Sequence, residues 1–214
     1  MRKKLYYTLL MLLSCSFIKA DERPSPFNIE NVLPLELWGW FSVENQENLA
    51  KLIKETKPKK IVEIGTFLGL SAIFMAHHMT EPGQKLYCVD PWQPYPEMAA
   101  AVPEANEKLL FAYEQFLSNC IHHNVYEKII PMRMTSMQAV QLFSNDVDLI
   151  YIDGSHDEED VYDDIVNWYP KLSPNGIMCG DDWSWTSVHK AIERALKVLN
   201  VKVKSMGNFW WFEK

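Results

Sequence analysis

The chain has 214 residues, which is enough for one ordinary domain with a sizeable core that needs neither disulfides nor a structural metal. Its composition is 48% hydrophobic, 13% aromatic and 23% charged, with only 8 Gly and 12 Pro, which excludes a disordered chain, collagen and a coiled coil. The formal net charge is −7, and the only basic cluster after residue 4 is the short run 57–60, so nucleic acid is not an expected partner.

The first twenty residues have the pattern of a secretion signal. A basic segment, residues 2–4, precedes a largely apolar stretch, residues 5–18, and Ala20 offers a small residue for cleavage. The apolar stretch is too short to span a bilayer comfortably. We therefore expect residues 1–20 to be a signal peptide and the mature protein to be exported, to the periplasm or the medium, without a membrane span. The alternative is a leader that is kept as a buried helix or an anchor.

The cysteines give two further expectations. Cys15 closes a segment that resembles the lipobox of bacterial lipoproteins, so lipidation of Cys15 is an alternative to cleavage after Ala20. Cys88, Cys120 and Cys179 are odd in number, and none has the C-x-x-C spacing of a metal site. We expect these three thiols to remain unpaired, which is unusual for an exported chain.

After a proline-interrupted arm over residues 21–41, the chain alternates between predicted helices and strands. A first helix is expected between Ser42, which can cap its N-terminus, and Pro58. Strands are expected over residues 60–65, 85–90, 129–134, 147–153 and 176–181, with a final hairpin of residues 201–205 and 209–213. Further helices are expected over residues 70–79, 104–119, 137–143, 158–172 and 188–199. The second of these is expected to present one face made of Leu109, Leu110, Tyr113 and Phe116.

This alternation predicts a doubly wound α/β fold, with a mostly parallel sheet and helices on both faces. The central strands agree, because residues 61–62, 149–152 and 177–179 are continuously apolar, as in strands that are buried on both sides. Ligands of such sheets bind outside the carboxyl ends of the strands. The residues that directly follow each strand are therefore the candidate site residues.

The first strand runs into the segment Glu63-Ile64-Gly65-Thr66-Phe67-Leu68-Gly69-Leu70-Ser71. Its two glycines allow a sharp turn and a close approach of backbone to ligand, and the next helix points its N-terminus there. Asp90 ends the second strand, 25 residues after Gly65, where an acidic group would bind a ribose diol. The middle glycine of the G-x-G-x-x-G motif is absent, which disfavours a nicotinamide-dependent oxidoreductase.

The pattern Glu63-x-Gly65-x-x-x-Gly69-x-Ser71 resembles the first motif of class I S-adenosylmethionine-dependent methyltransferases, in the variant of the catechol and caffeoyl-CoA O-methyltransferases. The resemblance covers roughly residues 42–214, including the final hairpin. It implies a Rossmann-like sheet of seven strands in the order 3-2-1-4-5-7-6, with strand 7 antiparallel. The residues that it implies for cofactor binding are Glu63, Gly65, Thr66, Gly69, Ser71 and Asp90, with Trp92 or the pair Thr135 and Ser136 near the adenine.

Three carboxylates follow two strands that we expect to be neighbours. Asp153 follows the fourth strand, and Asp181 and Asp182 follow the fifth. Like charges this close are unfavourable unless a cation binds them or one is protonated, and oxygen ligands suit Mg²⁺. Metal-dependent O-methyltransferases have one Asp and then an acidic or Asp-Asn pair at these places. The resemblance therefore implies that Asp153, Asp181 and Asp182 bind Mg²⁺ or a similar divalent cation.

The spacing Asp153-x-x-His156 is similar to that of macrolide-sugar O-methyltransferases, in which this histidine is the general base. A histidine titrates near neutral pH and can take the proton of a hydroxyl group. The alternative is a polar residue that hydrogen-bonds its own turn at the start of a helix. The lysine that follows the strand-four Asp in catechol enzymes is absent here, so a catechol is not the expected substrate.

Together these patterns predict an S-adenosylmethionine-dependent enzyme that methylates the hydroxyl of a small molecule with the help of a metal. Residues 91–103 and the N-terminal arm are expected to set the choice of acceptor, and the sequence indicates no particular oligomeric state. Because S-adenosylmethionine is a cytosolic cofactor, the predicted export leaves an alternative: an exported, non-catalytic binding protein that has kept the fold.

Overall fold

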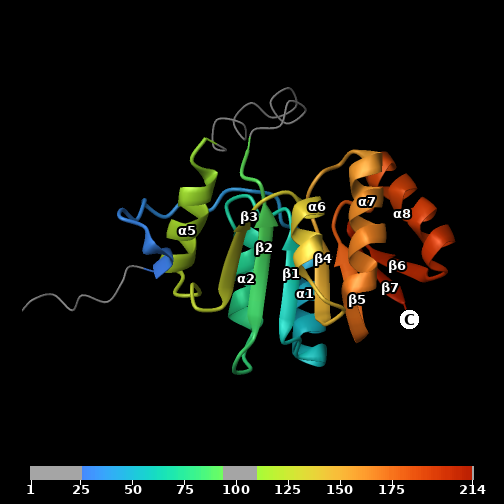
Figure 1. Ribbon diagram of the computed structural model, residues 1–214, viewed down its shortest axis with the longest axis horizontal. Coiled ribbons are helices and arrows are strands. Elements are labelled where there is room, and N and C mark those ends of the chain that lie inside the picture. Colours follow the sequence, from blue (N-terminus) through green and yellow to red (C-terminus); the bar gives the residue numbers. More distant parts are fainter. Residues whose placement is uncertain (1–25, 94–109, 214) are drawn as a thin grey trace, which may run out of the picture.

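The computed structural model describes residues 26–93 and 110–213, and it contains one seven-stranded sheet with helices on both faces (Figure 1). The predicted signal peptide, Cys15 and most of the segment between residues 91 and 111 lie outside the described residues. Within the described ranges, no helix combines the length and the apolar character that crossing a membrane requires.

Seven strands form the sheet: β1 (Lys60–Ile64), β2 (Lys85–Asp90), β3 (Ile129–Arg133), β4 (Val147–Ile152), β5 (Leu172–Gly180), β6 (Lys202–Met206) and β7 (Phe209–Glu213). Their order across the sheet is β3-β2-β1-β4-β5-β7-β6. The first five strands pair in parallel, and β7 is antiparallel to both of its neighbours. This topology confirms the predicted fold class.

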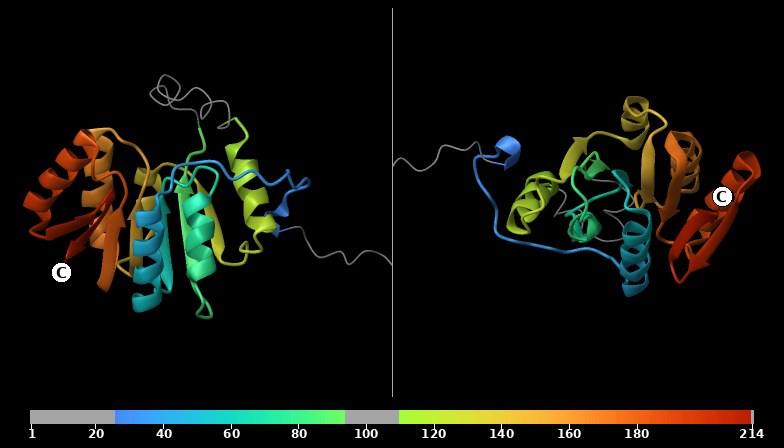
Figure 2. Two further views of the ribbon diagram at one scale, coloured as in Figure 1. Left: turned by 180° about the vertical axis from the view of Figure 1, so that it is seen from behind. Right: turned by 90° about the horizontal axis from the view of Figure 1, so that it is seen from below.

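Six α-helices lie in the described residues: α1 (Val43–Thr56), α2 (Leu70–His78), α5 (Ala112–His122), α6 (Ser136–Ala139), α7 (Glu158–Trp168) and α8 (Thr186–Leu199). Short 3₁₀ turns, η2 (Val140–Leu142) and η3 (Tyr169–Lys171), continue α6 and α7, and a third, η1 (Pro26–Asn28), lies in the N-terminal arm. Helices α1, α2 and α5 cover one face of the sheet, and α6, α7 and α8 cover the other (Figure 2).

Neighbouring residues of a buried strand belong to two different cores. Ile61 packs into the core under α1, α2 and α5, whereas Val62 packs into the core under α6, α7 and α8. Side chains alternate between the faces of a strand, so covering both faces requires apolar residues at successive positions. This is why β4 is apolar from Leu149 to Ile152 without a break.

Several predicted boundaries differ from the structure, and two of the differences have a clear local reason. Strand β5 begins at Leu172 rather than at residue 176, because its pairing with β4 continues past an irregularity near Val147. Helix α5 begins, in its described part, at Ala112, after Phe111 with non-helical backbone angles of −127° and 17°. Leu110 therefore leaves the face that it was expected to share with Tyr113 and Phe116, and it is 65% exposed.

The described part of the N-terminal arm lies along α5 and crosses toward α1 (Figure 2). The backbone N–H of Leu33 donates to Ser118 Oγ, 2.9 Å away, and that of Glu36 donates to Asn119 Oδ1 at 3.2 Å. Asn119 Nδ2 donates in turn to the carbonyl groups of Glu36 and Leu68. One buried side chain thus ties the arm to the turn after β1.

Cys88, Cys120 and Cys179 are all free and buried, as predicted. Burial raises the pKa of the Cys88 thiol well above its usual range, because the interior disfavours the charged thiolate. Buried, protonated thiols of this kind are unreactive. These cysteines belong to the core and not to a redox or metal site.

Candidate active site

The turn between β1 and α2, residues 65–69, carries the predicted cofactor motif. Gly65 and Gly69 have φ angles of 86° and 87°, in the left-handed region that favours glycine. A Cβ atom at Gly65 would lie 2.1 Å from the backbone carbonyl oxygen of Asp153. Only glycine fits here, and the turn is therefore in direct contact with the end of β4.

Asp90, at the end of β2, holds this turn in place. Its Oδ2 accepts hydrogen bonds from the backbone N–H groups of Thr66 and Phe67, both 2.9 Å away. Its Oδ1 accepts one from the N–H of Trp92 at 2.6 Å. Burial raises the pKa of Asp90, and the three backbone donors oppose that shift. The structure places Asp90 at the turn, as predicted, and its contact with a ribose stays a prediction.

Glu63 connects three of the predicted motif residues from inside the core. It has no exposed surface and accepts hydrogen bonds from Thr66 Oγ1 at 2.8 Å and Ser71 Oγ at 2.5 Å. Burial raises the pKa of Glu63 to about 7, and the two hydroxyl donors only partly offset it. Because both hydroxyls point to Glu63, the backbone of the turn is the part that can face a ligand.

The raised pKa of Glu63 predicts a pH-dependent stability. The pKa of Glu63 is higher in the folded protein than its usual value of 4.5, so protonated Glu63 stabilises the fold relative to ionised Glu63. This stabilisation is complete below about pH 4.5 and is lost as the pH rises through about 7. We expect wild type to lose about 2–3 kcal/mol relative to Glu63→Gln between pH 5 and pH 8. Urea unfolding of both proteins in EDTA at these two pH values measures the difference. Parallel pH profiles would contradict the assignment.

Trp92 and Ser136, which the sequence places near the adenine, make contacts inside the protein. Trp92 is 2% exposed, its ring stacks on Phe116, and its Nε1 donates to the Phe67 carbonyl at 2.7 Å. Ser136 Oγ hydrogen-bonds to Asp164 and accepts from Trp168 Nε1. In the structure these side chains support the turn and α7, and a contact with adenine stays a prediction.

Asp153, Asp181 and Asp182 form what we call the carboxylate cluster. Each offers one oxygen, and the three oxygens lie within 4.8 Å of one another. The predicted convergence of these side chains is therefore confirmed. A cavity of about 10 Å³ is lined by all three, and this is close to the volume that one water-sized particle needs.

The sheet and one tight turn produce this convergence. Ile152 of β4 pairs with Gly180 of β5, so Asp153 and Asp181 leave adjacent strands at the same level. Asp182 has a φ of 63°, in the left-handed region, and its backbone N–H donates to Asp181 Oδ1 at 2.6 Å. This turn brings the third carboxylate back to the other two.

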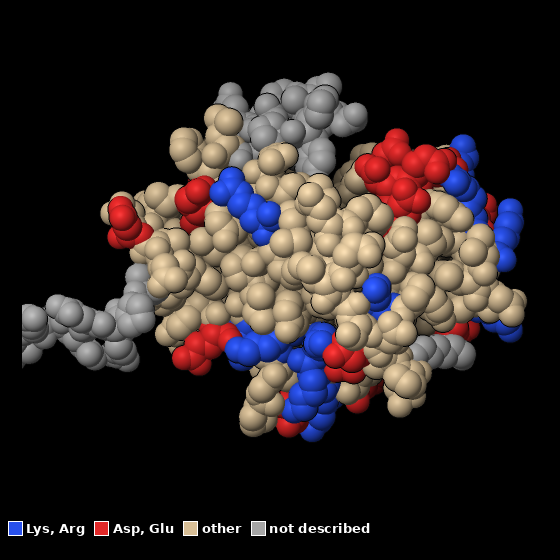
Figure 3. Space-filling model, viewed as in Figure 1, with Lys and Arg blue, Asp and Glu red and all other residues tan. Residues whose placement is uncertain are grey.

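The electrostatics of the cluster are unfavourable without a counter-charge. Desolvation, and then the carboxylates of Asp181 and Asp182, raise the pKa of Asp153 well above its usual range. Burial also raises the pKa of Asp181. On the outer surface, acidic side chains gather at the N-terminal end of α7, where Arg194 already pairs with Glu158 and Glu159 of the first turn (Figure 3). The arrangement favours a bound cation or a bound proton.

His156 lies beside the cluster. Its Nε2 is 2.7 Å from Asp182 Oδ2, and its ring stacks on Trp185 with the centroids 4.4 Å apart. The N-terminus of α7 is capped by Asp157, whose Oδ1 accepts from the N–H of Glu159. Asp182 thus orients the imidazole of His156, and Asp157, not His156, caps the helix.

Two residues that the sequence pattern does not indicate touch the cluster: Asn45 of α1 and Tyr151 of β4. Asn45 has no exposed surface, and its amide group hydrogen-bonds to the Asp181 carboxyl. Its Nδ2 is 3.5 Å from the Tyr151 hydroxyl, which itself hydrogen-bonds to Asp153. Asn45 Oδ1 has no hydrogen-bond partner among the described residues. A buried acceptor without a partner lowers the stability of the fold by about 1–3 kcal/mol. The sequence held one signal for Asn45: it is a polar residue on the same face of the helix as the apolar residues Leu49 and Ile53.

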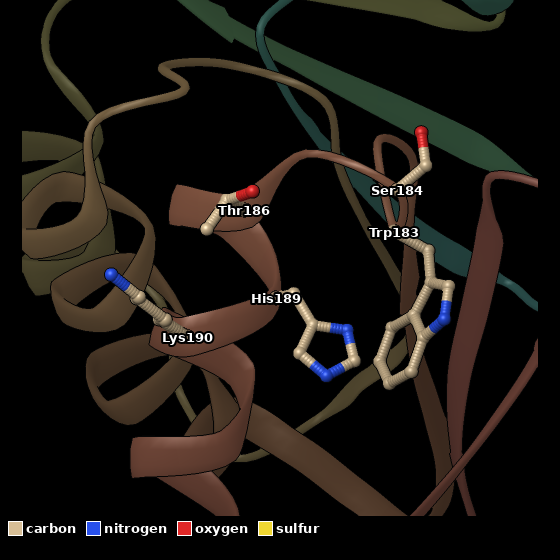
Figure 4. Close-up of a pocket in the computed structure, with 5 residues that line it drawn as sticks. All are labelled: Trp183, Ser184, Thr186, His189 and Lys190. Carbon is tan, nitrogen blue, oxygen red and sulfur yellow. The ribbon is translucent and has the colours of Figure 1, made fainter.

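A shallow hollow of about 540 Å³ lies beside the loop that follows Asp182 (Figure 4). It is lined by Trp183, Ser184, Thr186, His189 and Lys190. The rings of Trp183 and His189 pack edge to face, with their centroids 4.3 Å apart. The wall of the hollow therefore combines two packed rings with hydroxyl and ammonium groups. It begins at Trp183, the residue that follows Asp182 of the cluster.

Residues 62–183 match a family model described as a methyltransferase domain. Two curated proteins are similar over part of their length: the uncharacterized protein y4gI of Sinorhizobium fredii, 28% identical over 138 residues, and the O-methyltransferase hkm8 of Aspergillus hancockii, 24% identical over 130 residues. Each match covers 61% of this chain, but only 14% and 45% of those two proteins.

Solved structures of O-methyltransferases share the fold. The O-methyltransferase from Bacillus cereus, in complex with SAH, superposes with a TM-score of 0.59 at 15% identity, over 86% of this chain and 84% of that one. TomG from Streptomyces achromogenes, in complex with SAM, gives a TM-score of 0.61 at 13% identity, over 87% and 82%. The chain therefore belongs to the methyltransferase domain family and has the fold of the class I S-adenosylmethionine-dependent O-methyltransferases.

Proposed function

We propose that this protein transfers the methyl group of S-adenosylmethionine to a hydroxyl oxygen of a small molecule, assisted by a divalent cation such as Mg²⁺. One observation carries the proposal: the glycine turn after β1 is in direct contact with Asp153, whose carboxylate converges with those of Asp181 and Asp182. A site for the methyl donor and a site for a cation would thus adjoin each other at one edge of the sheet.

The donor site would consist of the turn over residues 65–69 and Asp90. The Thr66 and Ser71 hydroxyls are bonded to Glu63, and four backbone N–H groups of the turn have partners inside the protein, so the turn would meet the donor mainly by the close approach that its glycines allow. Asp90 Oδ1 accepts one backbone hydrogen bond in the structure, and a carboxylate oxygen can accept two. Asp90 can therefore hold the turn and still accept a hydrogen bond from a ribose hydroxyl.

The residues of the carboxylate cluster fit a divalent cation. They provide three carboxylate oxygens within 4.8 Å of one another, and Asn45, which has no exposed surface, contacts the Asp181 carboxyl. Mg²⁺ prefers oxygen ligands of this kind. When bound, such a cation would orient the acceptor hydroxyl and lower its pKa.

His156 would be the base. If Nε2–H donates to Asp182, Nδ1 is the basic nitrogen of the neutral ring and can take the proton of the acceptor hydroxyl. The Asp182 carboxylate would then stabilise the imidazolium. The oxygen displaces the methyl group from the sulfonium in line, and the positioning of the two reactants supplies much of the rate.

A comparison of methyl transfer with and without a metal tests this function. We expect S-adenosylhomocysteine to form from S-adenosylmethionine with hydroxylated acceptors, screened as sugars and phenols, in the presence of Mg²⁺. EDTA should abolish the reaction, and added Mg²⁺ should restore it. Equal rates in EDTA and Mg²⁺ would show a metal-independent methyltransferase.

Replacing His156 by Asn is expected to lower kcat by about 10²–10⁴-fold, because the acceptor then loses its base. The KM for S-adenosylmethionine should change little, since His156 lies on the cluster side of the site. The profile of kcat against pH should also lose the limb that reports the base. An unchanged kcat in His156→Asn would assign the proton transfer to another group.

We also propose that the protein is exported after cleavage at Ala20, on the strength of the basic and apolar pattern of residues 1–20. N-terminal analysis of the protein from its host tests this. A mature chain beginning at Asp21 is expected. An intact N-terminus would show that the leader is retained, and an acylated Cys15 would show a lipoprotein. Either result would overturn cleavage after Ala20.

A further inference from the structure

Asn45 makes contacts through both its backbone and its side chain. Its backbone N–H donates to Ser42 Oγ, the N-cap of α1, at 3.1 Å, so the first turn of the helix is fixed where it meets the sheet. The amide N–H group is directed to the Asp181 carboxyl and to the Tyr151 hydroxyl.

The amide oxygen of Asn45 is the buried acceptor that the described residues leave unsatisfied. Native proteins rarely bury such a group, and those that do usually have a ligand, ion or water at the place. The nitrogen of the same amide lies 3.5 Å from the Tyr151 hydroxyl, and the amide group contacts the Asp181 carboxyl. All of these groups offer oxygen, and together they match the preference of a hard divalent cation.

We propose that Asn45 is a fourth member of the cation site: its Nδ2 positions Asp181, and its Oδ1 supplies a further oxygen to the hydrated divalent cation. Tyr151 completes the arrangement, because its hydroxyl links the amide of Asn45 to Asp153. The helix α1 thereby takes part in a site that the strand ends alone do not complete. This inference rests on the proposed function, since it adds a residue to the cation site which that function requires.

Titration with Mn²⁺ in the absence of S-adenosylmethionine tests the proposal, with free Mn²⁺ followed by electron paramagnetic resonance. Asn45→Leu removes both amide atoms at similar volume, and Asn45→Asp keeps an oxygen at the same place. Asn48→Leu is the matched control, because Asn48 lies on the exposed side of the same helix and its Nδ2 donates to the Glu44 carbonyl. Thermal unfolding of each protein in EDTA reports its stability without a metal.

We expect wild type and Asn48→Leu to bind Mn²⁺ equally and Asn45→Leu to bind it about 10–100-fold more weakly. Asn45→Asp should retain affinity within about threefold of wild type or exceed it, because the fourth oxygen remains and gains a charge. In EDTA, the stability of Asn45→Leu reports the balance between the unpartnered oxygen that it removes and the contacts with Tyr151 and Asp181 that it gives up, and Asn45→Asp should be less stable than wild type.

Equal Mn²⁺ affinity of wild type and Asn45→Leu would overturn the role of Asn45 and leave the proposed function standing. If Asn45→Leu does not fold, a loss of Mn²⁺ binding in folded Asn45→Asp would overturn it instead. Absence of Mn²⁺ binding by wild type would overturn the cation assistance and this inference together.

Discussion

Replacing Asp153 by Asn is expected to weaken Mg²⁺ and Mn²⁺ binding at least about 100-fold and to lower the rate of methyl transfer correspondingly. The substitution keeps the shape of the side chain and removes one of three converging carboxylates. S-adenosylmethionine affinity should stay within about twofold, because the donor site is built from the turn after β1 and from Asp90. Calorimetric titrations with Mn²⁺ and with S-adenosylmethionine measure the two effects separately.

The matched control is Asp163→Asn, which removes a carboxylate from an exposed position on the neighbouring helix α7. Its cation affinity and activity should equal those of wild type. If Asp153→Asn kept the cation affinity of wild type, the carboxylates would not form one site. The enzyme would then be a metal-independent methyltransferase in which His156 acts alone as base.

Asp90→Asn is expected to weaken S-adenosylmethionine binding by about 10–100-fold, because a charged acceptor for the ribose contributes about 1.5–3 kcal/mol. The structure adds a second effect. Thr66, Phe67 and Trp92 donate backbone hydrogen bonds to this carboxylate, so its loss should also loosen the glycine turn and lower the free energy of unfolding. Calorimetry and urea unfolding measure affinity and stability on the same preparations.

Asp148→Asn separates the two effects. Asp148 also anchors backbone, accepting from the N–H groups of Lys59 and Lys60 at 2.8 and 3.0 Å, but at the amino end of β1. It should therefore lower stability without changing S-adenosylmethionine affinity. Unchanged affinity in folded Asp90→Asn would remove Asp90 from the donor site and leave it a structural role alone.

The parts of the structure that depend on local pattern or on strand order could be predicted from the sequence. Ser42 caps α1 as predicted, because a cap is a contact between residues three positions apart. The carboxylate cluster could be predicted because the end of a buried strand fixes where Asp153 and Asp181 leave the sheet. Once β4 and β5 are neighbours, their carboxyl ends must meet.

Contacts that depend on the packing of distant elements could not be predicted. Asn45 meets Tyr151 across 106 positions, and only the seating of α1 on the sheet brings them together. The sequence places Trp92 at an open strand end, but its positive φ of 47° turns it back into the core against Phe116. Such cases need the tertiary structure, because the type of a residue does not say which distant element it will contact.

The central claim is that the edge of the sheet around Gly65 and Asp90 binds S-adenosylmethionine. Calorimetric titration of wild type with S-adenosylmethionine, and separately with NAD, tests it most directly, because neither the acceptor nor the metal has to be known. We expect one S-adenosylmethionine to bind per chain and NAD to give no heat of binding. Absence of S-adenosylmethionine binding by the folded protein, or binding of NAD instead, would contradict the account.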